Sequence, residues 1–188
     1  MKKSLIVLLL SIVANVAFAQ VQVALGIKAG VNISKFDSNT SDNITSFHGG
    51  AFALFKLTKI GIQPEILLSQ QGSKFSDVSL GSQDLKASYL TIPVMLKIYL
   101  VAGLNLQAGP QFGFLTSAEL EGKDVKDAYK SSDVSANIGL GWDLPLGLTI
   151  DARYNLGLSE VNADTSLGSL KSRVIQISVG YKIFKLGK

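Results

Sequence analysis

Cysteine is absent from this chain of 188 residues, and histidine occurs only once, as His48. Without these ligands the sequence predicts no disulfide, no thiolate metal site and no transition-metal cluster. After residue 19, Lys and Arg form no run that would indicate nucleic-acid binding, and no 18 consecutive apolar residues occur that would form a membrane-spanning helix. Gly139-Leu140-Gly141 lies inside an alternating pattern with no helix after it, so we expect no nucleotide cofactor.

The first 19 residues have the three parts of a secretory signal peptide. Lys2 and Lys3 precede an apolar run from Leu5 to Val13, and Ala17-Phe18-Ala19 forms a small-x-small cleavage site. The apolar run is shorter than the ~20 residues that a spanning helix needs. We therefore expect a signal peptide over residues 1–19 and one domain over residues 20–188, with the net charge falling from +4 to +2 once the two lysines are removed.

What the sequence has in abundance is alternation of apolar and polar residues. The segment from Asp133 to Ser159 separates into an apolar and a polar list when every second residue is read, with only Pro145, Leu146 and Gly147 between its two halves. Successive side chains of a strand point to opposite faces, so this segment predicts two strands joined by a tight hairpin. Each strand would have one apolar and one polar face.

The same unit recurs along the chain and predicts eight strands of about 10–14 residues. Their connections alternate between long and short, which is typical of an all-β, eight-stranded antiparallel up-and-down transmembrane β-barrel. In the second strand, residues 51–55 are apolar on both faces and their register stays open. The expected strands are residues 24–34, 46–57, 60–71, 85–100, 103–116, 133–144, 148–159 and 175–183.

A soluble barrel of the lipocalin type, with an apolar interior, is the alternative for such a meander. The apolar list is bulky, whereas the interior of eight strands holds only modest side chains, so we expect the apolar face outside against lipid. Aromatic residues gather toward both strand ends, as they do at the two membrane–water interfaces. The expected girdle at the short-turn end is Phe55, Tyr99, Trp142, Tyr181 and Phe184, and the group at the long-loop end is Phe36, Phe47, Phe75 and Phe114.

Charged residues on the polar lists would then point into a narrow lumen. Unpaired charges are costly there, so these residues should pair with one another or with Asn and Gln. We expect them to form a plug that holds the barrel's shape, and the alternative is a polar path for protons or small solutes. The set is Lys28, Glu65, Lys97, Asp143, Asp151, Arg153 and Lys182.

His48 is the one residue that raises the question of catalysis. A hydrolase at the barrel rim would need this histidine beside a nucleophile or a water-activating carboxylate. A lone histidine near a strand end is more often an ordinary solvated side chain. We therefore expect no enzyme, with a rim hydrolase using His48 as the second alternative function.

The chain resembles the PorT-like outer-membrane β-barrel family of Bacteroidetes-type bacteria over essentially all of its mature part. The resemblance is carried in order by GIKAGVNIS (Gly26 to Ser34), IQPEILLSQQGSKF (Ile62 to Phe75), YLTIPVMLKIY (Tyr89 to Tyr99), AGPQFGFL (Ala108 to Leu115), ANIGLGWDL (Ala136 to Leu144) and ARYNLGLS (Ala152 to Ser159). It implies an outer-membrane barrel with its termini in the periplasm. It implies no activity, and only the eponymous branch of the family is linked to protein secretion and gliding. The chain departs from many such barrels by ending on Lys185-Leu186-Gly187-Lys188 rather than on an aromatic residue.

Together these observations predict a small outer-membrane barrel with a structural or interaction role through its long loops. The resemblance to the PorT-like family adds a link to protein secretion. The main alternative is a narrow pore for small solutes. The expected partners are outer-membrane lipid and lipopolysaccharide, the barrel-assembly machinery, and a protein that contacts the long loops, above all residues 117–132; we expect no nucleic acid and no cofactor. The expected location is the outer membrane, with the N-terminus in the periplasm.

Overall fold

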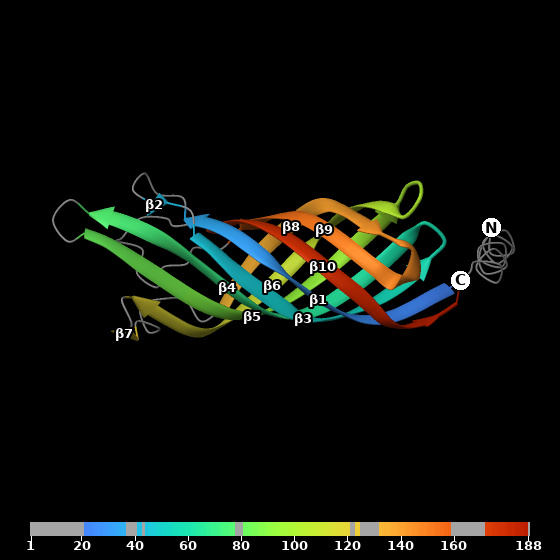
Figure 1. Cartoon of the computed structure of the whole chain (residues 1–188), viewed down its shortest axis with the longest axis horizontal. Coiled ribbons are helices and arrows are strands. Elements are labelled where there is room, and N and C mark those ends of the chain that lie inside the picture. The colour runs from blue at the N-terminus through green and yellow to red at the C-terminus, as the bar shows by residue number, and fades with distance from the viewer. Residues whose placement is uncertain are drawn as a thin grey trace, which may run out of the picture.

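The computed structural model describes residues 21–36, 41–42, 44–77, 81–120, 123–124, 132–158 and 172–187. Eight long strands dominate these residues, and each continues antiparallel to the strand before it (Figure 1). Two two-residue strands, β2 (Ser41–Asp42) and β7 (Lys123–Asp124), pair with the ends of β4 and β6. The long strands are β1 (Val21–Phe36), β3 (Ile44–Leu57), β4 (Ile60–Asp77), β5 (Gly81–Tyr99), β6 (Leu104–Leu120), β8 (Ser132–Asp143), β9 (Leu148–Gly157) and β10 (Ser172–Leu186).

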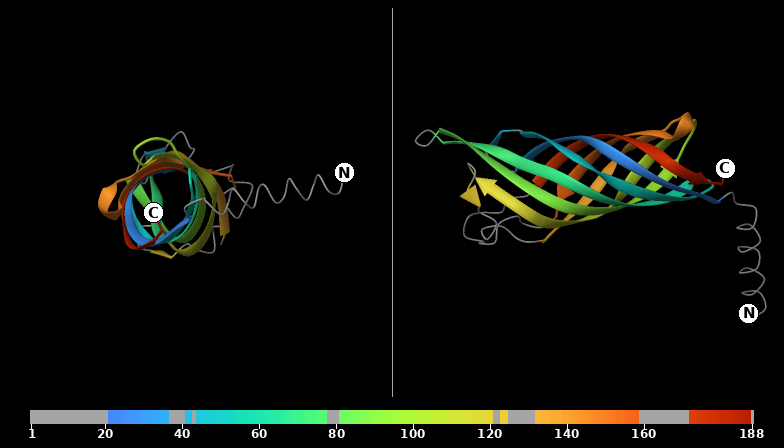
Figure 2. Two further views of the ribbon diagram at one scale, coloured as in Figure 1. Left: turned by 90° about the vertical axis from the view of Figure 1, so that its right-hand side faces the viewer. Right: turned by 60° about the horizontal axis from the view of Figure 1, so that its bottom comes forward.

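The sheet closes on itself because β1 pairs with both β3 and β10. Each of the other long strands pairs with its two neighbours, so the ring runs β1, β3, β4, β5, β6, β8, β9, β10. Figure 2 shows this ring down its axis and the tilt of the strands from the side. The expected eight-stranded up-and-down barrel is confirmed. In such a closed ring, strand pairing supplies partners for the backbone without leaving an open sheet edge.

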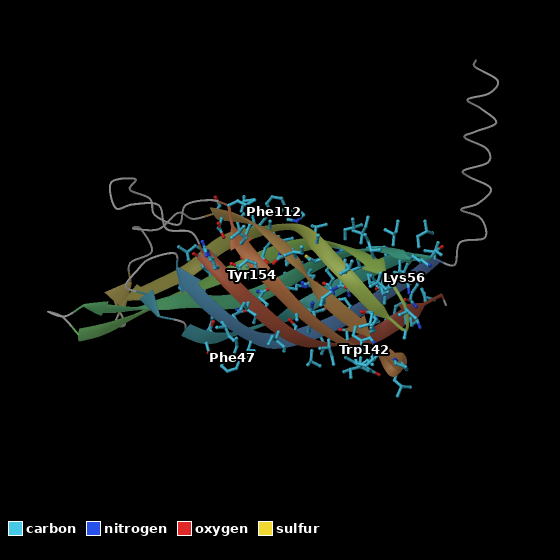
Figure 3. The ribbon with its side chains drawn as sticks, turned by 90° about the horizontal axis from the view of Figure 1, so that it is seen from above. Phe47, Lys56, Phe112, Trp142 and Tyr154 are labelled. Atoms are coloured by element: carbon cyan, nitrogen blue, oxygen red, sulfur yellow. The ribbon has the colours of Figure 1, made fainter. Side chains whose placement is uncertain are left out.

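Side chains alternate between the two faces of the wall, and the sorting is the reverse of that in a soluble protein. Ile138 is 65% exposed and its neighbour Asn137 only 3%. Among the described residues, buried polar side chains outnumber buried apolar ones, and large apolar side chains cover the outside. Outward aromatic rings include Phe47, Phe112 and Tyr154 in one part of the wall and Trp142 near the short turns (Figure 3).

Three tight turns join the strands at one end. Thr58 and Lys59 join β3 to β4, residues 100–103 join β5 to β6, and a single 3-10 turn (Pro145–Gly147) joins β8 to β9. Thr58, Ala102 and Leu146 adopt positive φ angles of 54°, 52° and 65°, as tight hairpin turns often require. Both described ends of the chain lie at this short-turn end as well (Figure 1).

Strand lengths were predicted too short at the opposite end. β4, β5 and β6 are 18, 19 and 17 residues long, and most of the expected loop over residues 76–83 is strand. Backbone pairing continues from Gln71–Ala87 to Asp77–Gly81, past the point where apolar and polar residues stop alternating. A hydrogen-bonded ladder needs only backbone groups, so it can outrun the side-chain pattern from which it was predicted.

The register of β3 is now assigned. Phe52 and Leu54 are buried inside at 4% and 0% exposure, whereas Ala51 and Phe55 point outward. Phe52 is paired across the ladder with Gly26, and a Cβ atom on that glycine would collide with the Phe52 ring. Leu54 likewise lies beside Gly61 of β4, where an added Cβ atom would come within 3.1 Å of its Cδ1. The two large apolar side chains therefore fit inside because the neighbouring strands carry glycine beside them.

The predicted signal peptide and most of the long connections lie outside the described residues. This holds for residues 1–19, for the loop at residues 160–170 and for most of residues 117–132. Among the residues that are described, no helix is long and apolar enough to cross a membrane.

Candidate functional site

The interior of the barrel gathers nearly all the buried polar side chains and is the candidate site. Its charged centre is formed by four residues from three strands: Lys28 on β1, Glu65 on β4, and Asp151 and Arg153 on β9. All four side chains are at most 1% exposed. Two cations and two carboxylates meet there, so their formal charges balance. We call this layer of lumen side chains, at mid-height in the barrel, the central level.

Arg153 and Glu65 form the main link across the lumen. Nη1 of Arg153 donates to Oε2 of Glu65 at 2.9 Å, and Nη2 donates to Oε1 at 2.7 Å. Lys28 Nζ donates to Glu65 Oε1 at 3.1 Å and to Asp151 Oδ2 at 2.7 Å. Bidentate, charge-assisted bonds of this kind fix both position and orientation. This level therefore connects β1, β4 and β9 by side chains as well as through the sheet.

Amide side chains complete the charged centre. Gln63 donates to Glu65 Oε1 at 2.7 Å, Gln107 donates to Asp151 Oδ1, and Arg153 Nε donates to Gln107 Oε1 at 2.9 Å. Among the described residues, every buried side-chain nitrogen and oxygen has a hydrogen-bond partner. A buried polar network that is fully satisfied in this way avoids the penalty of unpaired groups.

Toward the short turns, a second level is centred on a single carboxylate. Asp143 accepts from Lys97 at 3.2 Å, from Lys182 at 2.6 Å and from the hydroxyl of Tyr99 at 2.7 Å. Lys97 also donates to Gln63 at 3.0 Å and so joins this level to the centre. Lys56 lies here too, with its Nζ 3.9 Å from the centroid of the Tyr99 ring.

Toward the long loops, His48 forms a third, uncharged level. Its Nδ1 lies 2.7 Å from Asn32 Oδ1 and its Nε2 lies 2.8 Å from Ser178 Oγ. Asn32 is held in turn by donating to Ser69 Oγ at 3.0 Å and to the Gln70 carbonyl at 2.7 Å. A hydroxyl, an imidazole and an orienting amide in this order match the arrangement of an activated nucleophile. However, His48 and Ser178 are only 4% and 3% exposed.

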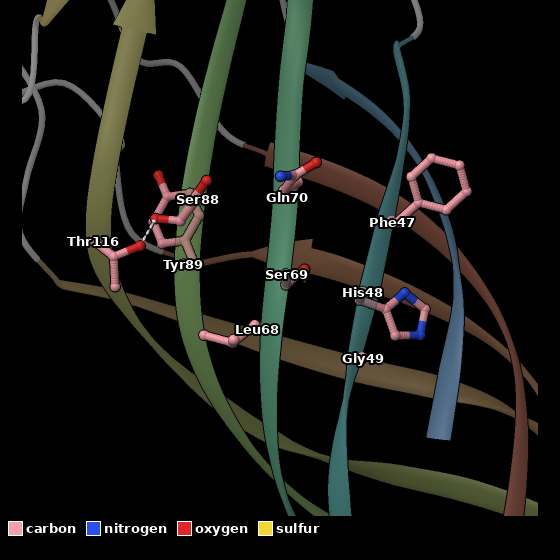
Figure 4. Close-up of a pocket in the computed structure, with 9 residues that line it drawn as sticks. All are labelled: Phe47, His48, Gly49, Leu68, Ser69, Gln70, Ser88, Tyr89 and Thr116. Carbon is pink, nitrogen blue, oxygen red and sulfur yellow. Dashed lines mark hydrogen bonds between the residues drawn. The ribbon is translucent and has the colours of Figure 1, made fainter. Parts of the chain in front are cut away.

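A cavity of about 420 Å³ lies beside this level, between β3 and β6 (Figure 4). Its lining mixes inward side chains such as His48 and Tyr89 with outward ones such as Phe47 and Leu68. Thr116 donates to the Ser88 carbonyl at 2.8 Å at its edge. Among the described residues, the lining includes neither a carboxylate nor Ser178, so the hydroxyl beside His48 does not open into this cavity.

All seven predicted lumen residues lie inside and take part in this network. One girdle residue, Tyr99, was wrongly predicted: it is 6% exposed and its hydroxyl donates to Asp143 inside the barrel. Its position in β5 has the same parity as Lys97, so the ring must point inward where that lysine does. The other four girdle residues, Phe55, Trp142, Tyr181 and Phe184, point outward with 43–51% of their surfaces exposed.

The sequence reasoning did not single out Lys56, Asn32, Ser178 or the amides that complete the network. For Asn32, Ser178 and the amides, the available signal was their place on the polar face of an alternating strand, whereas Lys56 lies in the strand whose register stayed open. Alternation along a strand does not say which strands face each other across the lumen. Within the described residues, no group of three or more His, Asp or Glu side chains is placed to hold a metal ion.

The sequence of residues 18–162 matches the family model described as "Outer membrane protein beta-barrel domain". A search of curated proteins gives no significant match. Among solved structures, Neisserial surface protein A has a TM-score of 0.57 and 14% identity, with 85% of this chain and 97% of that one covered. Ail, the attachment invasion locus protein of Yersinia pestis, solved in complex with a heparin analogue, has a TM-score of 0.53 and 16% identity over 89% of this chain and 99% of that one. At such low identities these similarities show the shared barrel fold.

Proposed function

Because the chain belongs to the family of outer membrane protein β-barrel domains, we propose that it is a small integral outer-membrane barrel whose lumen is closed by its own side chains. Its role would be structural or in interaction, with the long-loop end as the contact surface. The N-terminus and the short turns would face the periplasm, and the long loops the cell exterior.

The observation that supports this proposal best is the link between Arg153 and Glu65. These residues come from β9 and β4, which are four places apart in the ring of eight strands and therefore face each other. Ion pairs at 2.7–3.1 Å with side chains at most 1% exposed occupy the middle of the lumen. Moving a solute through would require these pairs to separate, which is costly in a narrow interior.

Single-channel recording in a planar bilayer tests the closed lumen. We expect no steady openings from the wild-type protein. Steady openings well above baseline would overturn the plug and favour the alternative, a narrow pore for small solutes. Glu65→Ser combined with Arg153→Ser is a useful comparison, because it shortens the two side chains that meet across the lumen.

The resemblance to the PorT-like branch supports a second, finer proposal, namely a contribution to protein secretion. Deleting the gene and comparing the proteins in the culture medium tests it. A specific loss of secreted proteins, restored by the intact gene, is the expected result. An unchanged secreted fraction with normal barrel levels in the complemented strain would overturn the secretion role and leave the structural one.

A hydrolase using His48 remains a candidate because Ser178 Oγ lies 2.8 Å from Nε2. We propose the non-enzymatic role instead, since both side chains are buried in the wall-lining network and an acyl substrate has to reach the hydroxyl. Treating the folded protein with a fluorophosphonate probe distinguishes the two. Covalent labelling of Ser178 that is lost in His48→Ala would favour the hydrolase.

A further inference from the structure

Positive charge inside the barrel is unevenly distributed. At the centre, Lys28 and Arg153 are matched by Glu65 and Asp151. Toward the short turns, three lysines gather around Asp143: Lys97 and Lys182 contact it at 3.2 and 2.6 Å, and Lys56 makes no ion pair with the described residues. Lys97 also lies 3.7 Å from Asp151 of the centre, so the two levels together hold five cations and three carboxylates. The mouth at the short-turn end therefore has an excess of positive charge.

Asp143 attracts Lys56, but its single negative charge is shared with Lys97 and Lys182 and cannot balance all three lysines. It already accepts hydrogen bonds from two lysines and from Tyr99, and Asn105 lies 3.4 Å from its Oδ1. Tyr99 is also committed, because its hydroxyl donates to Asp143 while its ring lies beneath Lys56. The ring face orients the ammonium group without neutralising it.

Further lysines strengthen the field at this mouth. Lys182, Lys185 and Lys97 all lie close enough to Lys56 for their charges to repel it, and Asp143 is the one carboxylate among the described residues of this mouth that attracts it. Lys59 is exposed in the neighbouring turn between β3 and β4. Figure 3 shows Lys56 at the end of the barrel where the short turns and Trp142 lie. Like charges held together on a rigid rim lower their repulsion when an anion binds between them.

We propose that the short-turn mouth of the barrel is a binding site for a phosphate group, with Lys56 and Lys182 as its central ligands and Lys59 and Lys185 at its rim. A phosphate has several acceptor oxygens and can take hydrogen bonds from more than one ammonium group at once. Lys56 is half-buried and Lys182 is fixed by Asp143, so both are pre-positioned before the anion arrives. The site shares Lys182 and Asp143 with the end of the plug, but it does not depend on the barrel's conduction or on its partner at the long loops.

The phosphate could come from a lipid headgroup in the surrounding leaflet or from a soluble phosphate compound. The first experiment uses the folded protein in zwitterionic detergent and inorganic phosphate as the probe. The thermal midpoint is followed by Trp142 fluorescence, with chloride at the same ionic strength as the reference. Because a ligand that binds only the folded state stabilises it, phosphate should raise the midpoint in a saturable way beyond the chloride series.

Lys56→Gln is the decisive variant, since Lys56 has no ion pair to lose among the residues that the structure describes. We expect its apparent affinity for phosphate to fall about tenfold, the consequence of losing one charge-assisted hydrogen bond. Lys35→Gln, at the long-loop end of β1, is the matched control and should respond like the wild type. Coinciding phosphate and chloride series, or equal responses of wild type and Lys56→Gln, would overturn the site.

A second experiment assigns the source of the phosphate. The same titration is repeated in nanodiscs of phosphatidylglycerol and of phosphatidylcholine. If a lipid headgroup occupies the mouth, the phosphatidylglycerol discs will stabilise the wild type more than Lys56→Gln and will suppress its response to added phosphate. If the ligand is soluble, the response to phosphate will persist in both lipids. Either outcome supports the phosphate site and identifies where its ligand comes from.

Discussion

Arg153 and Glu65 meet head-on across the lumen, with Nη1 2.9 Å from Oε2 and Nη2 2.7 Å from Oε1. The two strands that carry them, β9 and β4, are not neighbours in the sheet and are joined here by side chains alone. A contact of this kind makes opposite walls of the barrel depend on each other. It also means that removing one partner leaves the charged centre with one unbalanced buried charge, although Glu65 keeps Lys28 at 3.1 Å and Arg153 keeps Asp151 at 3.6 Å.

Glu65→Gln should therefore be strongly destabilising. Arg153 and Lys28 both lose a carboxylate partner while remaining buried, and breaking a buried ion pair costs about 3–5 kcal/mol. Urea unfolding of the protein in lipid vesicles measures the loss. Combining Glu65→Gln with Arg153→Gln should destabilise by less than the sum of the two single changes, because neither charge is then left alone. Additive losses would show that the pair does not act as a unit.

Gly141→Ala tests how tightly the network is packed. A Cβ atom at this position would lie among Gln107, Asn105 and the Asp151 carboxylate, closer than atoms can approach. Overpacking of a tight interior typically costs about 1–3 kcal/mol, so we expect a lower unfolding midpoint in urea. Gly49→Ala is the control, since its Cβ would meet the Lys28 carbonyl and Ala29 only at 3.6 and 3.9 Å. Equal stability of the two variants would contradict the close packing around residue 141.

These residues also show how far sequence reasoning reaches. The parity of Lys28, Glu65 and Arg153 placed them inside correctly, because strand alternation is a local property. Their partners could not be assigned in advance, since which side chains meet across a barrel depends on the tilt and stagger of all the strands. Tyr99 was misplaced for a related reason: its aromatic type suggested an interface, whereas its parity with Lys97 determines where it points.

Phe52 and Leu54 illustrate a second limit. Residues 51–55 of β3 are all apolar, so the sequence did not show which of their side chains point into the barrel. The structure resolves it through Gly26 on β1, whose lack of a side chain provides the space for the Phe52 ring. Complementarity of large and small residues across strands could be recognised only once the pairing of β1 with β3 was known.

His48→Ala should reduce stability without removing an activity. The variant leaves Asn32 and Ser178 without the ring that bridges them, and unsatisfied buried polar groups cost about 1–3 kcal/mol each. Loss of the unheated, fast-running band at a lower temperature on a semi-native gel measures the effect. His48→Gln keeps a donor and an acceptor at this position and should restore part of the stability. A variant as stable as the wild type would show that the bridge contributes little.

Ile138 and Asn137, which are neighbours on β8, point to opposite faces of the barrel wall. Ile138 is 65% exposed on the outside, and Asn137 is 3% exposed and donates to Gln111 inside at 3.1 Å. In a membrane barrel, an arginine on the lipid face near the midplane costs about 2–4 kcal/mol. Ile138→Arg should therefore impair folding into lipid vesicles more than Ile138→Ala by about that margin. Asn137→Arg would instead be limited by crowding and charge in the lumen.

Stability alone does not show which solvent Ile138 meets, so the decisive measurement is one of accessibility. A fluorophore on a cysteine introduced at Ile138 should be quenched by brominated lipid and protected from aqueous iodide, because its side chain points to the hydrocarbon. The matched position is Ala152 on β9, which is also exposed on the outer face and should behave alike. Strong iodide quenching at both sites in vesicles would mean that the apolar face meets water and that the barrel does not span the bilayer.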